Sequence, residues 1–134
     1  MEHMHEFGER ILQAGGKSTN IELVLQEERL GGNGPILAHA LHCLGGQVSL
    51  VGALGYPAIE PLFTALASNC QECISIAPSG KTDALEFSDG KLLFGKHASI
   101  LTLDDKTIVD RVGKERLVAL LEQSTLFASA NWTM

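Results

Sequence analysis

The chain has 134 residues, of which 45% are apolar and 19% are charged, and its formal net charge is −6. This length fits one domain with a single core, and the composition is typical of a globular protein rather than a disordered one. Basic residues are scattered singly, so the acidic balance argues against a nucleic-acid partner. No run approaches the roughly 20 apolar residues of a membrane span. The opening MEHMHE lacks the features of a signal peptide, and the cysteines are few, so we expect a cytoplasmic protein without a membrane partner.

The first half of the chain predicts two isolated elements and then a strand–helix alternation. Apolar residues at helical spacing predict a helix over residues 5–15, and a looser alternation predicts a half-exposed strand over 21–30. After a glycine break, Pro35 suits the first turn of a helix whose apolar stripe stops at the next pair of glycines. A short apolar run over 48–54 predicts a strand buried on both faces.

The second half continues this order and adds a hairpin. The predicted elements are a helix over 57–69, a strand over 73–77, strands over 83–88 and 91–95, a helical segment over 104–123 broken at Gly113, and a strand over 126–132. Asp89-Gly90 lies between the paired strands, where a type I′ turn needs positive φ at both central positions. The alternation predicts an α/β protein with a mostly parallel sheet covered by helices, and the hairpin predicts an added β-lid.

Two short motifs resemble functional sites, but each is better explained without one. Gly16-Lys17-Ser18 resembles the end of a phosphate-binding loop, but the first glycine of that motif and its preceding strand are missing. Cys70 and Cys73 form a single Cys-x-x-Cys pair, whereas a structural zinc site needs four ligands and a redox pair would normally begin a helix. We interpret the two cysteines as buried or half-buried thiols.

The run from Gly31 to Gly55, GGNGPILAHALHCLGGQVSLVGALG, carries an ordered set of glycines. It contains a double glycine before a helix, a helix ending in Leu-Gly, and a strand ending in Val-Gly-x-Leu-Gly. This order resembles the N-terminal signature of the ribokinase-like (PfkB) carbohydrate kinases. The later order of elements, including a Thr-led strand before an Asp-Gly turn, is also similar, so the resemblance covers about residues 20–132.

The resemblance implies a fold, an activity and a site. The fold would be part of a ribokinase-like three-layer sandwich, a single truncated domain over 1–134 with lid strands near 20–31 and 82–96 that would also pair two subunits in a homodimer. The intact family member would transfer the γ-phosphoryl of ATP, with Mg²⁺, to a hydroxyl of a sugar or nucleoside. The implied substrate contacts are Gly31, Gly32 and Asn33, and the implied lid residues are Thr82, Asp83 and Glu86. Asn131 and Trp132 would end the last strand, where ligands gather in α/β sheets, although Trp132 as plain core is an equally good reading.

The chain also departs from the family pattern. Ile36 stands where many members have a sugar-binding asparagine, and Tyr56-Pro57 stands where aspartate is usual. The Gly-Ala-Gly-Asp motif, which supplies the base and the anion hole, has no counterpart, and neither does the nucleotide-binding region. We therefore expect the substrate-binding portion of a kinase, inactive by itself and binding neither ATP nor Mg²⁺ alone. Two alternatives stay open: a non-catalytic sugar-binding or dimerisation module, and an unrelated α/β protein.

Overall fold

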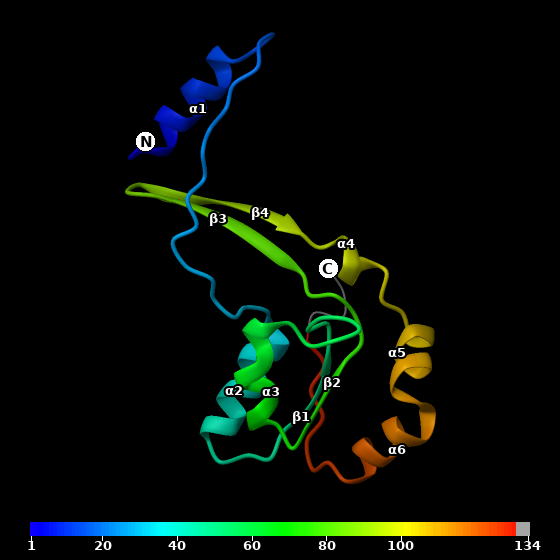
Figure 1. The fold of residues 1–134 in the computed structure, drawn as a ribbon. Helices are drawn as coiled ribbons and strands as arrows, with labels where there is room; N and C mark the ends of the chain where they lie inside the picture. Colours follow the sequence, from blue (N-terminus) through cyan, green and yellow to red (C-terminus); the bar gives the residue numbers. More distant parts are fainter. Residues whose placement is uncertain (131–134) are drawn as a thin grey trace. The chain divides into compact units, whose positions relative to one another are not determined.

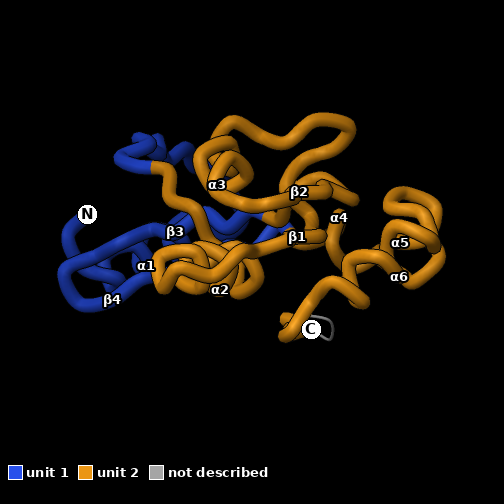
Figure 2. Tube along the Cα trace, turned by 90° about the horizontal axis from the view of Figure 1, so that it is seen from below, with its two compact units in different colours: residues 1–27, 81–96 blue, residues 28–80, 97–134 orange. Residues whose placement is uncertain are grey.

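The computed structural model describes residues 1–130 of the chain (Figure 1). Its contacts divide the chain into two compact units, residues 1–27 with 81–96 and residues 28–80 with 97–134 (Figure 2). Each unit is described by itself below, as unit 1 and unit 2. The single domain expected over residues 1–134 stays a prediction.

Unit 1 contains one helix and one hairpin. Helix α1 is Met4–Gln13, and strands β3 (Lys81–Phe87) and β4 (Gly90–Lys96) pair antiparallel. The predicted N-terminal helix and the predicted hairpin are thus confirmed. The register pairs Phe87 with Gly90, so the turn residues are Ser88 and Asp89, one position earlier than Asp89-Gly90.

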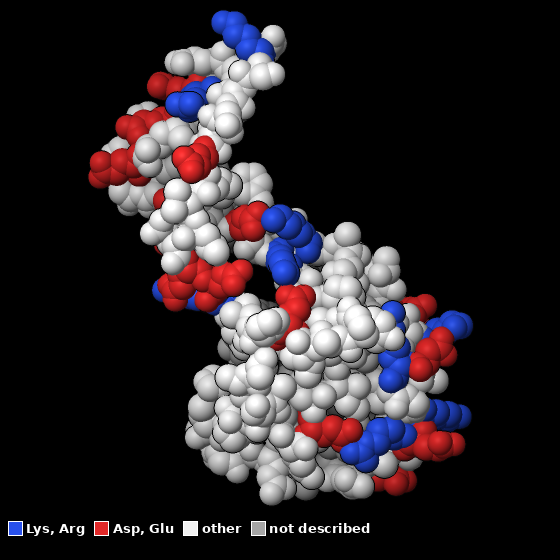
Figure 3. All heavy atoms as spheres, viewed as in Figure 1, with Lys and Arg blue, Asp and Glu red and all other residues white. Residues whose placement is uncertain are grey.

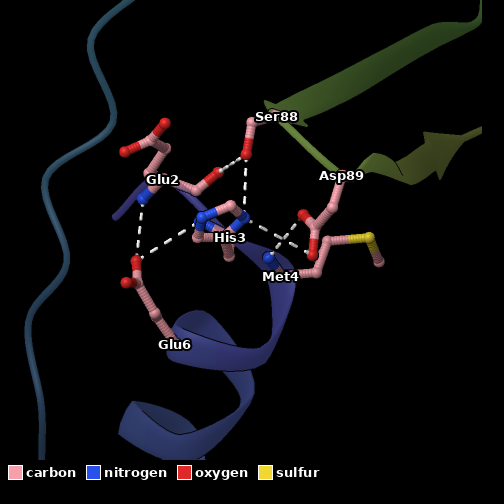
Figure 4. Close-up of polar contacts among 6 residues, drawn as sticks. All are labelled: Glu2, His3, Met4, Glu6, Ser88 and Asp89. Atoms are coloured by element: carbon pink, nitrogen blue, oxygen red, sulfur yellow. Dashed lines mark hydrogen bonds and ion pairs between the residues drawn. The ribbon is translucent and has the colours of Figure 1, made fainter.

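The N-terminal segment is hydrogen-bonded to this turn (Figure 4). The backbone N–H of Ser88 donates to the Glu2 carbonyl at 2.8 Å, and the N–H of Met4 donates to Asp89 Oδ1 at 2.9 Å. His3 Nδ1 lies 2.8 Å from Ser88 Oγ and 3.8 Å from Asp89 Oδ2. Both contacts use the same ring nitrogen, whereas a catalytic triad uses one nitrogen for the serine and the other for the aspartate. We therefore interpret the cluster as the contact that docks the N-terminal segment on the turn.

An aromatic pair closes the same interface. The rings of Phe7 and Phe87 lie 5.6 Å apart between centroids at 53°, a tilted geometry that aromatic pairs favour. Phe7 is the buried residue of α1. Phe7 of the apolar stripe that predicts α1 thus has its partner on β3, whereas Ile11 and Leu12 are exposed.

We expect the docking of residues 2–7 on the turn to weaken in acid. The hydrogen bond from the Met4 N–H, with a smaller contribution from the charge of His3, lowers the pKa of Asp89 below its ordinary value of 3.8. A lowered pKa means that the carboxylate favours docking above pH 3.8 and that this contribution is lost as the pH falls through the lowered pKa. The Met4 amide proton, followed by NMR, should titrate with a midpoint below 3.8.

The control for this titration is Asp89→Asn, which keeps an acceptor oxygen and removes the charge. The Met4 amide of that variant should lose the acid transition. A midpoint at or above 3.8 in the parent chain would contradict the bond seen between Met4 and Asp89.

Unit 2 contains the strand–helix alternation. Its elements are α2 (Asn33–Cys43), β1 (Ser49–Gly52), the 3-10 helix η1 (Pro61–Phe63), α3 (Thr64–Asn69), β2 (Glu72–Ser75), α4 (Ala98–Leu101), α5 (Asp105–Val112) and α6 (Lys114–Glu122). Strands β1 and β2 pair in parallel, from Ser49 with Glu72 to Gly52 with Ser75. The predicted break at Gly113 is confirmed, since Gly113 has φ +88° between α5 and α6.

A small apolar core fixes the arrangement of this unit. Ala38 of α2, Phe63 and Leu66 at η1 and α3, and Leu54 beyond β1 pack into one buried cluster. Leu54 is 1% exposed. The result is a mixed α/β protein with one small parallel and one small antiparallel sheet among the described residues. The three-layer sandwich implied by the resemblance is a more specific architecture than this mixed α/β class, and it remains a proposal.

Three predicted elements differ from the structure. The strand predicted over 21–30 is absent: residues 18–32 form neither helix nor strand, and Leu25 is 74% exposed. Residues 126–130 form no strand either, and Leu126 and Phe127 are exposed. In both stretches the apolar pattern suits a strand, but a strand needs a neighbouring edge for its N–H and C=O groups.

The third difference concerns the helix predicted over 57–69, which begins only at Pro61. Residues before it form the loop that leaves β1. Strand β1 is also less buried than predicted, because Ser49 is exposed. Helix α4, only four residues long, was not predicted.

Candidate functional site

The carboxyl ends of β1 and β2 form the edge at which ligands gather in parallel sheets. The Ser75 hydroxyl at the end of β2 accepts a hydrogen bond from the Leu54 N–H at 2.9 Å and donates to the Gly55 carbonyl. The Gly55 N–H in turn donates to the Ala77 carbonyl at 2.9 Å. These bonds fasten the loop after β1 to the loop after β2.

Gly55, the last glycine of the ordered motif, is required by this geometry. Its φ is +120°, and a Cβ at this position would lie 2.4 Å from the Ala58 carbonyl oxygen and 2.6 Å from the Glu60 nitrogen. Both clashing atoms are backbone atoms, so no side-chain movement relieves them. The motif therefore encodes a close backbone reversal at the edge of the sheet.

A cation lies at the same edge. The Arg111 guanidinium, from α5, sits 3.9 Å from the centroid of the Tyr56 ring and donates to the Ile76 carbonyl. Cation–π attraction holds the guanidinium over the ring. Sequence reasoning identified Tyr56 as a departure from the family and missed Arg111, whose partners are distant in the chain.

The carboxylate of Glu60, near the same edge, is held in place by a hydrogen bond from Ser79. The hydroxyl of Ser79, which is buried, donates to Glu60 Oε1 at 2.8 Å, and the Glu60 N–H donates to the Leu54 carbonyl at 2.8 Å. The edge thus combines a fixed carboxylate, a stacked guanidinium and aligned backbone groups. Such groups suit recognition of a polar ligand with several hydroxyls. No sequence motif signalled Glu60 or Ser79.

The structure places the predicted glycines at the beginning of α2. Gly32 has φ +87° and is the N-cap of the helix, and its carbonyl accepts from the Ile36 N–H at 3.1 Å. A Cβ at Gly31 would meet no atom within 4 Å. Gly31, Gly32 and Asn33 therefore lie together at a helix N-terminus, where backbone N–H groups lack intrahelical partners. Ile36, one turn later, is 53% exposed.

The predicted lid residues lie on β3. Thr82, Asp83 and Glu86 are exposed, and Asp83 pairs with Lys96 of β4 at 2.5 Å. They belong to unit 1, whereas the three residues at α2 belong to unit 2. Asn131 and Trp132, the other predicted contacts, lie outside the described residues.

Charges over α5 and α6 are mixed, with basic and acidic side chains side by side on the face drawn in Figure 3. Lys106 pairs with Asp110 at 2.5 Å within α5, and Arg116 of α6 binds Glu72 of β2, with Nε to Oε1 at 3.0 Å. Within residues 1–130, no group of three or more His, Cys, Asp or Glu side chains could hold a metal ion. No helix in that range is long and apolar enough to cross a membrane.

Comparison with known proteins gives the class and then the family. Residues 1–134 match the model of a family described as prokaryotic ketohexokinase, which places the chain among the sugar kinases. A ketohexokinase from Haloferax volcanii is 33% identical over 129 residues, which are 95% of this chain and 34% of the relative. The chain belongs to the prokaryotic ketohexokinase family. It spans about a third of the length of that curated relative. No solved structure matches it.

Proposed function

We propose that these 134 residues are the substrate-binding portion of an ATP-dependent ketohexokinase, which transfers a phosphoryl group to a hydroxyl of a ketohexose. The match of the family model to residues 1–134 carries the proposal. The glycine motif supports it, because Gly32 and Gly55 both have positive φ at the beginning of α2 and beyond β1. The rest of the three-layer sandwich would surround these elements.

In this proposal the beginning of α2 binds the sugar. Gly31 and Gly32 let the backbone approach the ligand, and the N–H groups of the first helical turn donate to its hydroxyls. The Asn33 side chain adds a donor and an acceptor. Ile36 contributes an apolar contact where many family members have asparagine.

The hairpin β3–β4 would serve as the lid. Thr82, Asp83 and Glu86 would contact substrate on closure, and a closed lid excludes water so that the phosphoryl group goes to the sugar. Leu93 and Phe94 of β4 are exposed, which supports pairing of the lid with a second copy. Asn131 and Trp132 would complete the sugar pocket.

The nucleotide and the metal do not fit the described residues. No phosphate-binding loop occurs in the sequence, and no acidic cluster within residues 1–130 could hold Mg²⁺. The Gly-Ala-Gly-Asp motif that would supply the base is also absent from these 134 residues. We therefore expect this portion alone to transfer no phosphoryl group and to bind no ATP.

A pair of glycines with the same backbone geometry provides the test. Gly32 has φ 87° and ψ 136°, and Gly113 has φ 88° and ψ 136°, each as the N-cap of a helix. Alanine at either position imposes a similar strain of about 1–3 kcal/mol. Gly32→Ala should weaken fructose binding about tenfold or more, whereas Gly113→Ala should leave it unchanged. Isothermal calorimetry with fructose, ribose, adenosine and ATP measures this.

Equal losses of fructose affinity in both variants would show that the substitutions act by destabilising the fold. That result would contradict a sugar-binding site at the beginning of α2. Binding of ATP by the 134-residue chain would contradict the division of roles proposed here. Fructose binding without phosphoryl transfer in the full-length natural protein would favour the non-catalytic sugar-binding module.

A further inference from the structure

Two thiols lie together at the junction of α3 and β2. Cys70 is the C-cap of α3, and Cys73 belongs to β2. Both are free and half-buried, they share a side-chain hydrogen bond, and they pack against the apolar core of unit 2. Cys43, the other cysteine, is exposed. The proposed kinase chemistry uses none of the three.

The pair is open to small reagents. Cys70 and Cys73 both line a surface pocket of about 360 Å³, together with Ala67 and Ser68 of α3 and with Gln71 and Glu72. Ile59 of the loop after β1 and Thr64 of α3 also line this pocket, which includes the amino end of β2. A small reagent in this pocket can therefore reach both sulfurs.

The surroundings of the two thiols raise the pKa of both. Burial raises the pKa of Cys70, and the hydrogen bond from Cys73 opposes this rise. Burial and the negative charge of Cys70 together raise the pKa of Cys73 to about 11. Both thiols are therefore harder to ionise than a free cysteine, and we take Cys70 as the attacking thiol, an order that the single replacements below test. The other charged groups at the pocket are Glu72 and its partner Arg116, which neutralise each other.

We propose that Cys70 and Cys73 form a reversible disulfide site, closed by exchange with a low-molecular-weight disulfide such as glutathione disulfide. The Cys70 thiolate attacks one sulfur of the reagent, which forms a mixed disulfide and releases one glutathione thiolate. Cys73 then loses its proton and attacks Cys70 Sγ, which releases the second glutathione. The two protein thiols are oxidised, the reagent is reduced to two thiols, and the two protons go to those thiols. The bond ties the end of α3 to the beginning of β2.

The experiment uses the chain with Cys43→Ser, which removes the exposed thiol. This protein is incubated with glutathione disulfide at about pH 7 and about pH 9 and quenched in acid. The mass of the intact protein is then measured by mass spectrometry. We expect a product lighter by two hydrogens, carrying no glutathione, blocked to alkylation and restored by dithiothreitol. Closure should be faster at the higher pH, because exchange requires the thiolate.

Single replacements in the same background separate the two roles. Cys73→Ser should accumulate one glutathione on Cys70, and Cys70→Ser should react far more slowly. The folded chain should give at least about tenfold more disulfide relative to glutathione adduct than the chain unfolded in urea, because the fold holds the sulfurs in contact. Two stable adducts, two unreacted thiols, or equal ratios in folded and unfolded chains would overturn the proposal.

Discussion

Gly55→Ala should be among the most destabilising single substitutions in this chain, at about 3 kcal/mol or more. The added Cβ would lie 2.4 Å from the Ala58 carbonyl oxygen and 2.6 Å from the Glu60 nitrogen, at a φ of +120°. Relief requires the loop after β1 to move, which would break the bond from the Gly55 N–H to the Ala77 carbonyl. Urea unfolding followed by circular dichroism measures the loss.

The matched control for this substitution is Gly8→Ala. Gly8 lies inside helix α1, and a Cβ there meets no atom within 4 Å. Alanine is the better helix former by about 1 kcal/mol, so Gly8→Ala should be neutral or stabilising. Similar losses in the two variants would show that the reversal at Gly55 is not the constraint on the motif.

Leu54→Ala should cost about 2–5 kcal/mol, the range for large-to-small changes in a core. Leu54 is 1% exposed and packs with Ala38, Phe63 and Leu66. This core is small, so the loss is a large part of the stability of unit 2. The urea midpoint should fall sharply, or the chain should be unfolded in water.

Leu44→Ala provides the control for the cavity, because Leu44 is 84% exposed at the end of α2. The same side-chain atoms are removed from solvent rather than from the core, so the expected change is within about 0.5 kcal/mol. A Leu54→Ala variant as stable as Leu44→Ala would contradict the core described for unit 2.

The locally encoded elements were predicted well. The helix at residues 5–15, the helix after Pro35 and the break at Gly113 all depend on apolar spacing, on proline at a first turn or on a glycine with positive φ. These are properties of a few consecutive residues. The hairpin was also found, although its turn lies at Ser88 and Asp89 rather than one residue later.

Elements that need a distant partner were predicted poorly. Residues 21–30 alternate like a strand, yet no strand forms there. The turn is hydrogen-bonded to Glu2 and Met4, more than 80 residues away in the chain, and no local pattern indicates these contacts. A sequence pattern shows which face of a segment is apolar but not whether a hydrogen-bonding edge is present.

The candidate site also contains some features that the sequence predicts and others that depend on contacts between distant segments. The amino-acid sequence by itself determined the ordered glycines from Gly31 to Gly55 and the sugar-kinase family that they resemble, because positive φ and close backbone approach require glycine at fixed positions. Only the tertiary structure decided that Arg111 stacks on Tyr56 and that Ser79 holds Glu60. Those contacts join segments far apart in the chain, and they exist only once the apolar core has brought the carboxyl ends of β1 and β2 together.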